Sequence, residues 1–166
     1  MGLFDRTQPE PDEDSAGGGE GILPVDKARL EAWLRRSKQR FFVGDDGHLG
    51  GMWNGSIFTF ALAGHHEVLQ VRGQWNRLLS LDRRPEVMAM VNARHARLLW
   101  PQCFVLVQDD GTMRFAAEVS TPVRQGLSER QLARAMRLGI GSALAVFAEL
   151  ALRYPDPALQ APEALG

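Results

Sequence analysis

The feature that most constrains the fold is a long apolar segment near the C-terminus, which predicts a helix from Ser128 to about Tyr154. Ser128 with Gln131 three residues later forms a capping-box pattern, in which two side chains satisfy free backbone N–H groups at a helix start. Apolar or small residues then recur at the three-and-four spacing of one buried helical face: Leu132, Met136, Gly139, Ala143, Phe147, Leu150 and Tyr154. Pro155 ends the pattern, because the residue before a proline is disfavoured in the helical conformation.

The second half of this segment, residues 139–152, is apolar on most of its sides. Such a helix needs cover on more than one side, so we expect it to lie across a sheet and also against another helix or a second subunit. It is too short for a bilayer, which takes about 17–25 apolar residues. Gly139 and Gly141 each lower helix propensity by about 1 kcal/mol, and we expect them to allow close approach of a neighbouring backbone.

Composition bounds the class of protein. The chain has 166 residues, is 45% hydrophobic and carries a net charge of −1. One domain with a substantial core is therefore expected, without a global field that attracts nucleic acid or an anionic membrane. Cys103 is the single cysteine and lies in an apolar run, which predicts a small buried hydrophobe and excludes an intramolecular disulfide. The N-terminus lacks a basic and then apolar signal segment, so we expect a cytoplasmic protein.

Two segments are predicted to be disordered tails. Residues 1–21 contain six acidic side chains against Arg6, together with prolines and a run of three glycines. Such a composition buries too little apolar surface to offset the entropy of ordering. We interpret it as a solvating tail, with attraction to a basic partner as the alternative. Residues 156–166 contain Pro157 and Pro162 and form the second tail, which leaves one domain over residues 22–155.

The order of elements in this domain is read from periodicity and turn residues. A helix is expected from about Pro24 to Ser37, with Pro24 near its first turn. Strands follow at 41–43, 48–53, 57–63 and 68–75, with Asn54-Gly55 as a hairpin turn. A second helix at 83–99 with Asp82 as its N-cap, a hairpin of strands at 103–108 and 112–121, and the last helix complete the chain. This order, α-β(3-4)-α-β-β-α, predicts an α+β fold with helices segregated on an antiparallel sheet.

Catalytic and metal-binding patterns are weak. His65 and His66 lie in a turn without cysteines or a zinc-binding spacing, so they are interpreted as surface histidines, and no metal or cofactor is expected. A nucleophile elbow, a phosphate loop and a dinucleotide fingerprint are all missing. A small-molecule enzyme remains an alternative, for which Ser120, Glu118 and His95 would have to form a triad.

Nucleic-acid binding is the other alternative, through arginine-rich helix surfaces. It would use a first cluster at residues 35–40 together with Arg83, Arg84, Arg94 and Arg97. The near-neutral charge and interleaved acidic residues argue against it. The first cluster is more readily explained as a solvated helix end whose basic side chains suit the dipole.

Several segments, in order, resemble the YbjN-domain family in its actinobacterial form. They are Gly51-Met52-Trp53, residues 68–77, residues 91–95 with Trp100-Pro101, residues 117–121, and residues 127–141 with Gly139-Ile140-Gly141. The resemblance covers residues 24–155. It implies a fold similar to that of type III secretion chaperones, which are small dimers that bind extended segments of partner proteins. YbjN-domain proteins are described as sensory transduction regulators, and the family has no catalytic residues to carry over.

The resulting hypothesis is a non-enzymatic protein-binding or regulatory module, expected to be a homodimer. Tryptophans near element ends are typical interface anchors, although each could instead belong to the core. Arg72, Asn92 and Glu118 are candidates for buried polar contacts or a peptide-facing groove, with an internal Arg72–Glu118 salt bridge as the alternative. The predicted binding residues are Trp53, Arg72, Trp75, Asn92, Trp100 and Glu118.

Overall fold

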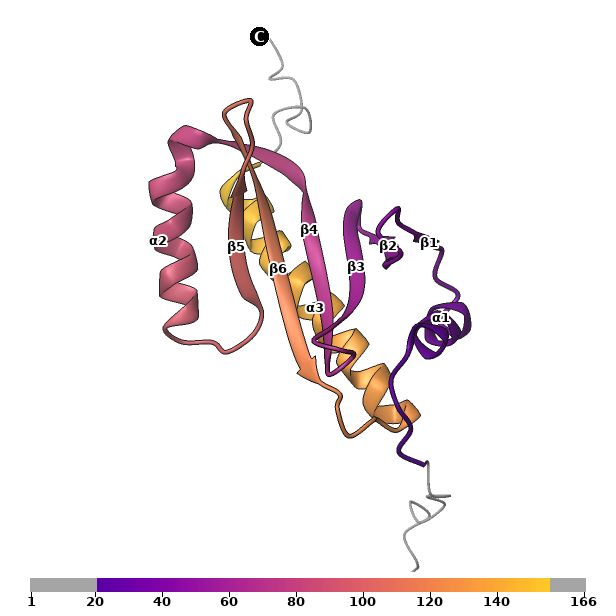
Figure 1. Cartoon of the computed structure of the whole chain (residues 1–166). Coiled ribbons are helices and arrows are strands. Elements are labelled where there is room, and N and C mark those ends of the chain that lie inside the picture. The colour runs from indigo at the N-terminus through magenta and orange to yellow at the C-terminus, as the bar shows by residue number, and fades with distance from the viewer. Residues whose placement is uncertain (1–20, 156–166) are drawn as a thin grey trace, which may run out of the picture.

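The computed structural model describes residues 21–155. Apart from Gly21, both predicted disordered tails lie outside the described residues. The elements follow the predicted order (Figure 1). They are α1 (Lys27–Arg36), β1 (Phe41–Val43), β2 (Leu49–Trp53), β3 (Ser56–Ala63), β4 (Val68–Ser80), the 3₁₀ turn η2 (Leu81–Arg83), α2 (Arg84–His95), β5 (Gln102–Val107), β6 (Thr112–Pro122) and α3 (Glu129–Arg153).

The strands form one antiparallel sheet in the order β1-β2-β3-β4-β6-β5. The first four strands are a meander of short connections. In the β2–β3 hairpin, Asn54 and Gly55 have the positive φ values of 48° and 74° that this two-residue turn requires. The chain then leaves the sheet through α2 and returns as the β5–β6 hairpin. Strand β6 pairs with β4, so these two neighbouring strands come from separate halves of the chain.

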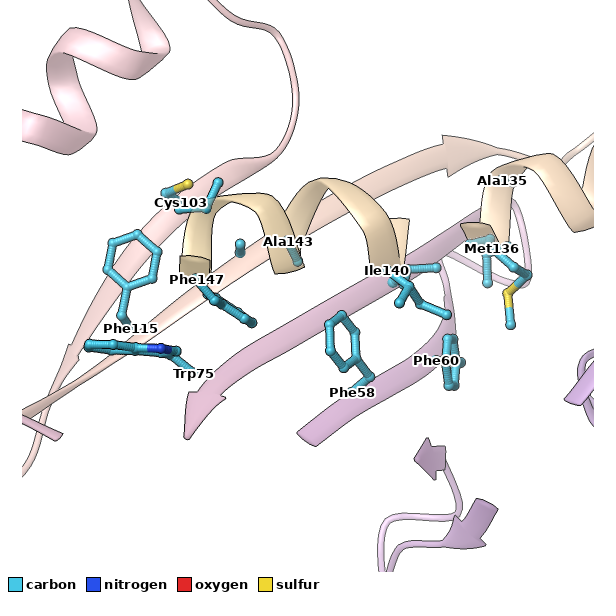
Figure 2. Close-up of a cluster of buried hydrophobic side chains, with 14 of the residues drawn as sticks. Phe58, Phe60, Trp75, Cys103, Phe115, Ala135, Met136, Ile140, Ala143 and Phe147 are labelled. Atoms are coloured by element: carbon cyan, nitrogen blue, oxygen red, sulfur yellow. The ribbon is translucent and has the colours of Figure 1, made fainter. Parts of the chain in front are cut away.

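All three helices lie on the same face of the sheet. Leu30 of α1, Val87 of α2 and Met136 of α3 belong to one cluster of buried side chains, together with Phe60 and Val71 from the strands. The centre of the cluster is the contact of α3 with β4 and β6. Figure 2 shows side chains of α3 pointing toward those of the strands. The fold class predicted from the sequence is therefore confirmed.

Helix α3 begins as predicted: the Ser128 side chain accepts from the Gln131 N–H, and the Gln131 side chain reaches back to the Ser128 N–H. Gly139 lies against β4, where an added Cβ would be 2.5 Å from the Val71 Cβ. The close approach at Gly139 is therefore to a side chain of β4, and not to a neighbouring backbone as expected. At Gly141 an added Cβ would meet nothing within 4 Å, so the same expectation is wrong there within one copy of the chain.

The expectation that this segment is too short to span a bilayer needs correction. Among the described residues, α3 alone is long and apolar enough to span a bilayer by length and composition, with 25 residues and a mean hydropathy of 1.6 in its most apolar window. A core helix of a soluble protein meets the same criterion, and α3 buries one side against the sheet. Ion pairs tie its two ends to the other helices, Arg29–Glu129 to α1 and Arg94–Glu149 to α2.

Several predicted boundaries differ from the structure. Helix α1 begins after Asp26, whose side chain caps the Arg29 N–H, so Pro24 precedes the helix. Strand β4 runs on to Ser80 through a register shift between Gln74 and Leu78. Asp82 is not the cap of α2, because it lies within η2 and α2 begins without a side-chain cap. Helix α2 ends at His95 rather than near Leu99.

Candidate functional site

The opposite face of the sheet carries no helix in the described part of the chain, and we call it the helix-free face. Its side chains come from alternate residues of each strand. Strand pairing aligns Thr59, Arg72, Glu118 and Gln102 as one row across four strands. A second row aligns Met52, Ile57, Gln74, Ala116 and Phe104. This surface is where the structure brings predicted site residues together.

Glu118 on β6 is the centre of a polar cluster on this face. Only 5% of the residue is exposed, and burying a carboxylate is unfavourable unless it is paired and hydrogen-bonded. Its Oε2 accepts from Nε and pairs with Nη2 of Arg72, each at 2.8 Å. Its Oε1 accepts from Gln70 Nε2 at 3.1 Å and from Ser120 Oγ at 2.9 Å. Both carboxylate oxygens are therefore satisfied, and the alternative of an internal Arg72–Glu118 salt bridge is confirmed.

Arg72 joins this buried cluster to the surface. Its guanidinium carbon lies 5.1 Å from the centre of the Phe104 ring, a cation–π contact that holds the planar group over β5. The side chain is nevertheless 48% exposed, unlike that of Glu118 at 7%. Guanidinium has five N–H donors, and the bonds to Glu118 leave donors of the same group for a carbonyl or carboxylate of a bound molecule.

Apolar side chains surround the polar cluster. Met52, Ile57 and Leu106 are 61%, 43% and 43% exposed, and their strands place them on the helix-free face. Phe42 lies on this face over Gly50, with its ring at the place where a Cβ on this glycine would stand. A side chain at Gly50 would displace that ring. The face therefore combines exposed apolar surface with one fixed charged group, as protein interfaces do.

The sequence reasoning missed Gln70, Ser120 and Phe104 as members of this cluster. Alternation along β4 and β6 already places Gln70 beside Arg72 and Ser120 beside Glu118 on one side of each strand. The missing information was that β4 and β6 are neighbours, with Arg72 opposite Glu118.

Two of the predicted tryptophans lie on the other side of the sheet. Trp75 is 3% exposed and belongs to the core, as Figure 2 shows, so its assignment as a binding residue is corrected. Trp53 is half-buried and makes edge-on ring contacts with Phe58 and Phe60 at 5.3 and 5.8 Å. The core interpretation therefore holds for Trp75 and for most of Trp53.

Asn92 and Trp100 lie apart from the Arg72–Glu118 cluster. Asn92 is exposed on α2, so the buried polar contact that was one of its two predicted roles is not formed. Trp100 is 48% exposed on the connection from α2 to β5, next to exposed Leu98 and Leu99. Of the six predicted residues, only Arg72 and Glu118 form a common site.

The arrangement required for a serine triad is not formed. Ser120 donates to Glu118, whereas His95 Nε2 accepts from the Cys103 N–H at 2.9 Å on the far side of the sheet. Burial raises the pKa of the Cys103 thiol to about 11, as expected of a buried hydrophobe. His65 and His66 are exposed turn residues, and no group of three or more potential metal ligands occurs within residues 21–155.

Comparison with known proteins identifies one family. The YbjN family, described as "Putative bacterial sensory transduction regulator", matches residues 26–152. The crystal structure of YbjN from E. coli is similar with a TM-score of 0.69 at 18% identity, over 80% of this chain and 96% of that chain. An uncharacterized protein from Methanothermobacter thermautotrophicus gives a TM-score of 0.56 at 12% identity, over 78% and 99% of the two chains.

A chain of the HopA1–SchA chaperone–effector complex is also similar, with a TM-score of 0.47 at 18% identity, over 76% of this chain and 97% of that chain. No curated protein matches the chain. At these identities, the likenesses to YbjN and to the Methanothermobacter protein establish the fold alone.

Proposed function

The chain belongs to the YbjN family, and we propose that it is a non-enzymatic cytoplasmic regulator that acts by binding another polypeptide through the helix-free face. The description of the family as a sensory transduction regulator supports the regulatory part of this proposal. The binding part rests on one observation, the exposed apolar side chains that surround the Arg72–Glu118 cluster.

The composition of the face favours a polypeptide over a small molecule. Met52, Ile57 and Leu106 are spread over three strands, so a ligand that covers all three must be extended. Arg72 offers N–H donors at the centre of this apolar area and is held there by Phe104. A partner segment with apolar side chains and a central carboxylate or carbonyl matches both properties.

Crosslinking from the face tests the proposal. A photo-crosslinking amino acid at Gln74, in the full chain expressed in its native host, should capture a partner. The double variant Met52→Asp/Ile57→Asp should lose this capture, because two charges replace apolar contacts on the face. Leu99→Asp is the matched control, since Leu99 is an exposed apolar residue outside the sheet. Equal capture by the double variant, or equal loss in the control, would contradict binding through this face.

We also propose that two copies associate through the outer side of α3. Leu138, Gly141, Ala145, Ala148 and Leu152 are all exposed, and their spacing of three and four is that of a coiled-coil seam. Leu152 is 87% exposed, and only 44% of the most apolar window of α3 is buried. A second copy of the same helix is the occupant that fits, because a two-fold interface brings identical surfaces together.

A further inference from the structure

The near-zero net charge of the chain conceals a separation of charge. The whole chain has 19 basic and 20 acidic residues. Residues 1–20 hold six of the acidic residues and one basic residue, and residues 156–166 hold two more acidic residues, which leaves 18 basic and 12 acidic residues in 21–155. The described domain is therefore basic, and the N-terminal segment is strongly acidic.

The positive charge of the domain is concentrated in the two segments that contain α1 and the first half of α3. Residues 26–40 and 128–137 together contain nine basic and three acidic side chains, which equals the whole excess of the domain. The ion pairs of Glu129 with Arg29 and Arg36 hold these two segments together. The Arg29 guanidinium, followed by that of Arg36, keeps the pKa of Glu129 below its usual value, so this carboxylate stays ionised and paired.

A groove of about 580 Å³ runs between the two helices. It is lined by Trp33 and Arg36 of α1, by Ala133 and Arg137 of α3, and at one end by Glu129 and Arg130. Arg134 continues the basic side of α3 at helical spacing and is exposed. Within residues 21–155, neither Arg134 nor Arg137 takes part in an ion pair. We call this surface the basic groove.

We propose that the acidic segment at residues 10–14 of the same chain occupies the basic groove. This segment contains Glu10, Asp12, Glu13 and Asp14 within five residues. Its charge is opposite to that of the groove, and the half-buried Ala133 offers apolar surface to the prolines beside it. The proposal is independent of partner binding, because the groove and the helix-free face lie on opposite sides of the sheet.

The chain path brings this segment to the groove. Leu23 pairs with Leu127 through N–H···O distances of 2.9 and 3.3 Å, so the N-terminal segment joins the domain beside the start of α3. Eight residues lie between Asp14 and Leu23, including Gly17-Gly18-Gly19, and a glycine-rich linker of that length spans about 16 Å on average. Arg137 lies eight residues beyond Glu129, where α3 begins, and therefore about 12 Å along the helix. The acidic residues therefore reach the middle of the groove without extension of the linker.

Because the acidic segment and the basic groove belong to the same chain, weak ion pairs between them are enough for occupation of the groove. Exposed ion pairs are individually weak and are screened by salt. A short flexible linker nevertheless keeps its ligand at an effective concentration on the order of millimolar. Occupation in cis is therefore expected at low ionic strength, and it closes the groove to other polyanions.

Paramagnetic relaxation in the full chain tests this contact. A nitroxide attached to the variant Ser15→Cys would report on the groove, and the buried Cys103 thiol with its raised pKa should stay unlabelled. At about 50 mM salt, the amide signals of Ser37, Ala133 and Arg137 should lose most of their intensity. They should recover at about 1 M salt, where the Debye length falls to about 3 Å.

Charge variants separate this contact from random encounters. Neutralising the segment with E10Q, D12N, E13Q and D14N, or the groove with Arg134→Gln/Arg137→Gln, should restore the signals. Arg97→Gln/Arg114→Gln removes the same charge elsewhere and should leave the broadening in place. Unbroadened groove signals at low salt, or broadening that survives neutralisation, would overturn the proposal. Broadening only between spin-labelled and isotope-labelled copies in a mixture would also overturn it, since the contact would then be in trans.

Discussion

At the scale of single residues, the most informative feature is the buried carboxylate of Glu118. It lies on a sheet face that no helix of residues 21–155 covers, and neighbouring long side chains keep it away from water. Three side chains donate to it, and the guanidinium of Arg72 supplies the only positive charge among them. The cluster is therefore both a structural element of the sheet and the fixed polar point of the proposed binding surface.

Removing Arg72 should destabilise the fold more than its exposure suggests. In Arg72→Met, Glu118 keeps the bonds from Gln70 and Ser120 but loses its countercharge, at a cost of about 1–3 kcal/mol for a buried group left without its partner. Urea unfolding measures the difference. Arg114→Met is the matched control, because Arg114 lies exposed on the same face with a 3.3 Å bond to Gln108. An equal effect of both substitutions would contradict the role assigned to Arg72.

At the scale of elements, α3 uses its two glycines differently. Gly139 faces β4 and lets the helix backbone approach the Val71 side chain, which positions the whole helix on the sheet. Gly141 faces outward into open space. Glycine is therefore required for packing at position 139. At position 141 it only lowers helix propensity in a single copy of the chain.

Alanine substitution should separate these roles. Gly139→Ala should lower the free energy of unfolding by about 1–3 kcal/mol, because an added methyl at 2.5 Å from the Val71 Cβ overpacks the core. Gly141→Ala should raise it by up to about 1 kcal/mol through helix propensity alone. Each can be measured by denaturant unfolding under conditions that keep the oligomeric state the same. Equal effects at the two positions would show that α3 does not rest on β4 as described.

At the scale of the whole molecule, one copy leaves three distinct surfaces for interaction. The helix-free face is apolar around a fixed charge, the outer side of α3 is apolar at heptad spacing, and the groove between α1 and α3 is basic. The helix-free face lies on the other side of the sheet, so partner binding there is compatible with both other interactions. The outer side of α3 and the basic groove adjoin on one helix, since Arg134 precedes Leu138 by one turn.

The oligomeric state tests the outer side of α3. Size-exclusion chromatography with light scattering at tens of micromolar should give about twice the chain mass of 18.4 kDa. Ala145→Glu/Leu152→Glu should give a single chain, because two charges per copy would meet across the seam. Ala28→Glu, at an exposed alanine of α1, is the control and should remain a dimer. A wild-type mass of one chain at these concentrations would contradict the proposed homodimer.

The sequence alone determined the order of the elements and most of their cores. Alternation identified β3, β4 and β6, turn residues such as Asn54-Gly55 delimited the shorter strands, and Ser128 with Gln131 identified the start of α3. These signals are local, because periodicity and turn chemistry depend on neighbouring residues. The sequence placed the cap of α2 wrongly at Asp82 and extended the predicted helix past its observed end at His95. Both differences show that local preferences for helix ends give way to tertiary packing.

Only the tertiary structure decided which local surfaces meet. The pairing of β4 with β6 brings Arg72 opposite Glu118, although 46 residues separate them in the chain. The placement of all helices on one face buries Trp75 and leaves Ile57 exposed. Both are apolar residues of strands in which the two faces alternate along the chain, so the sequence does not show which face is covered. Strand pairing and helix placement join segments distant in sequence, and their free energy depends on the combined burial of both partners, which neither segment encodes by itself.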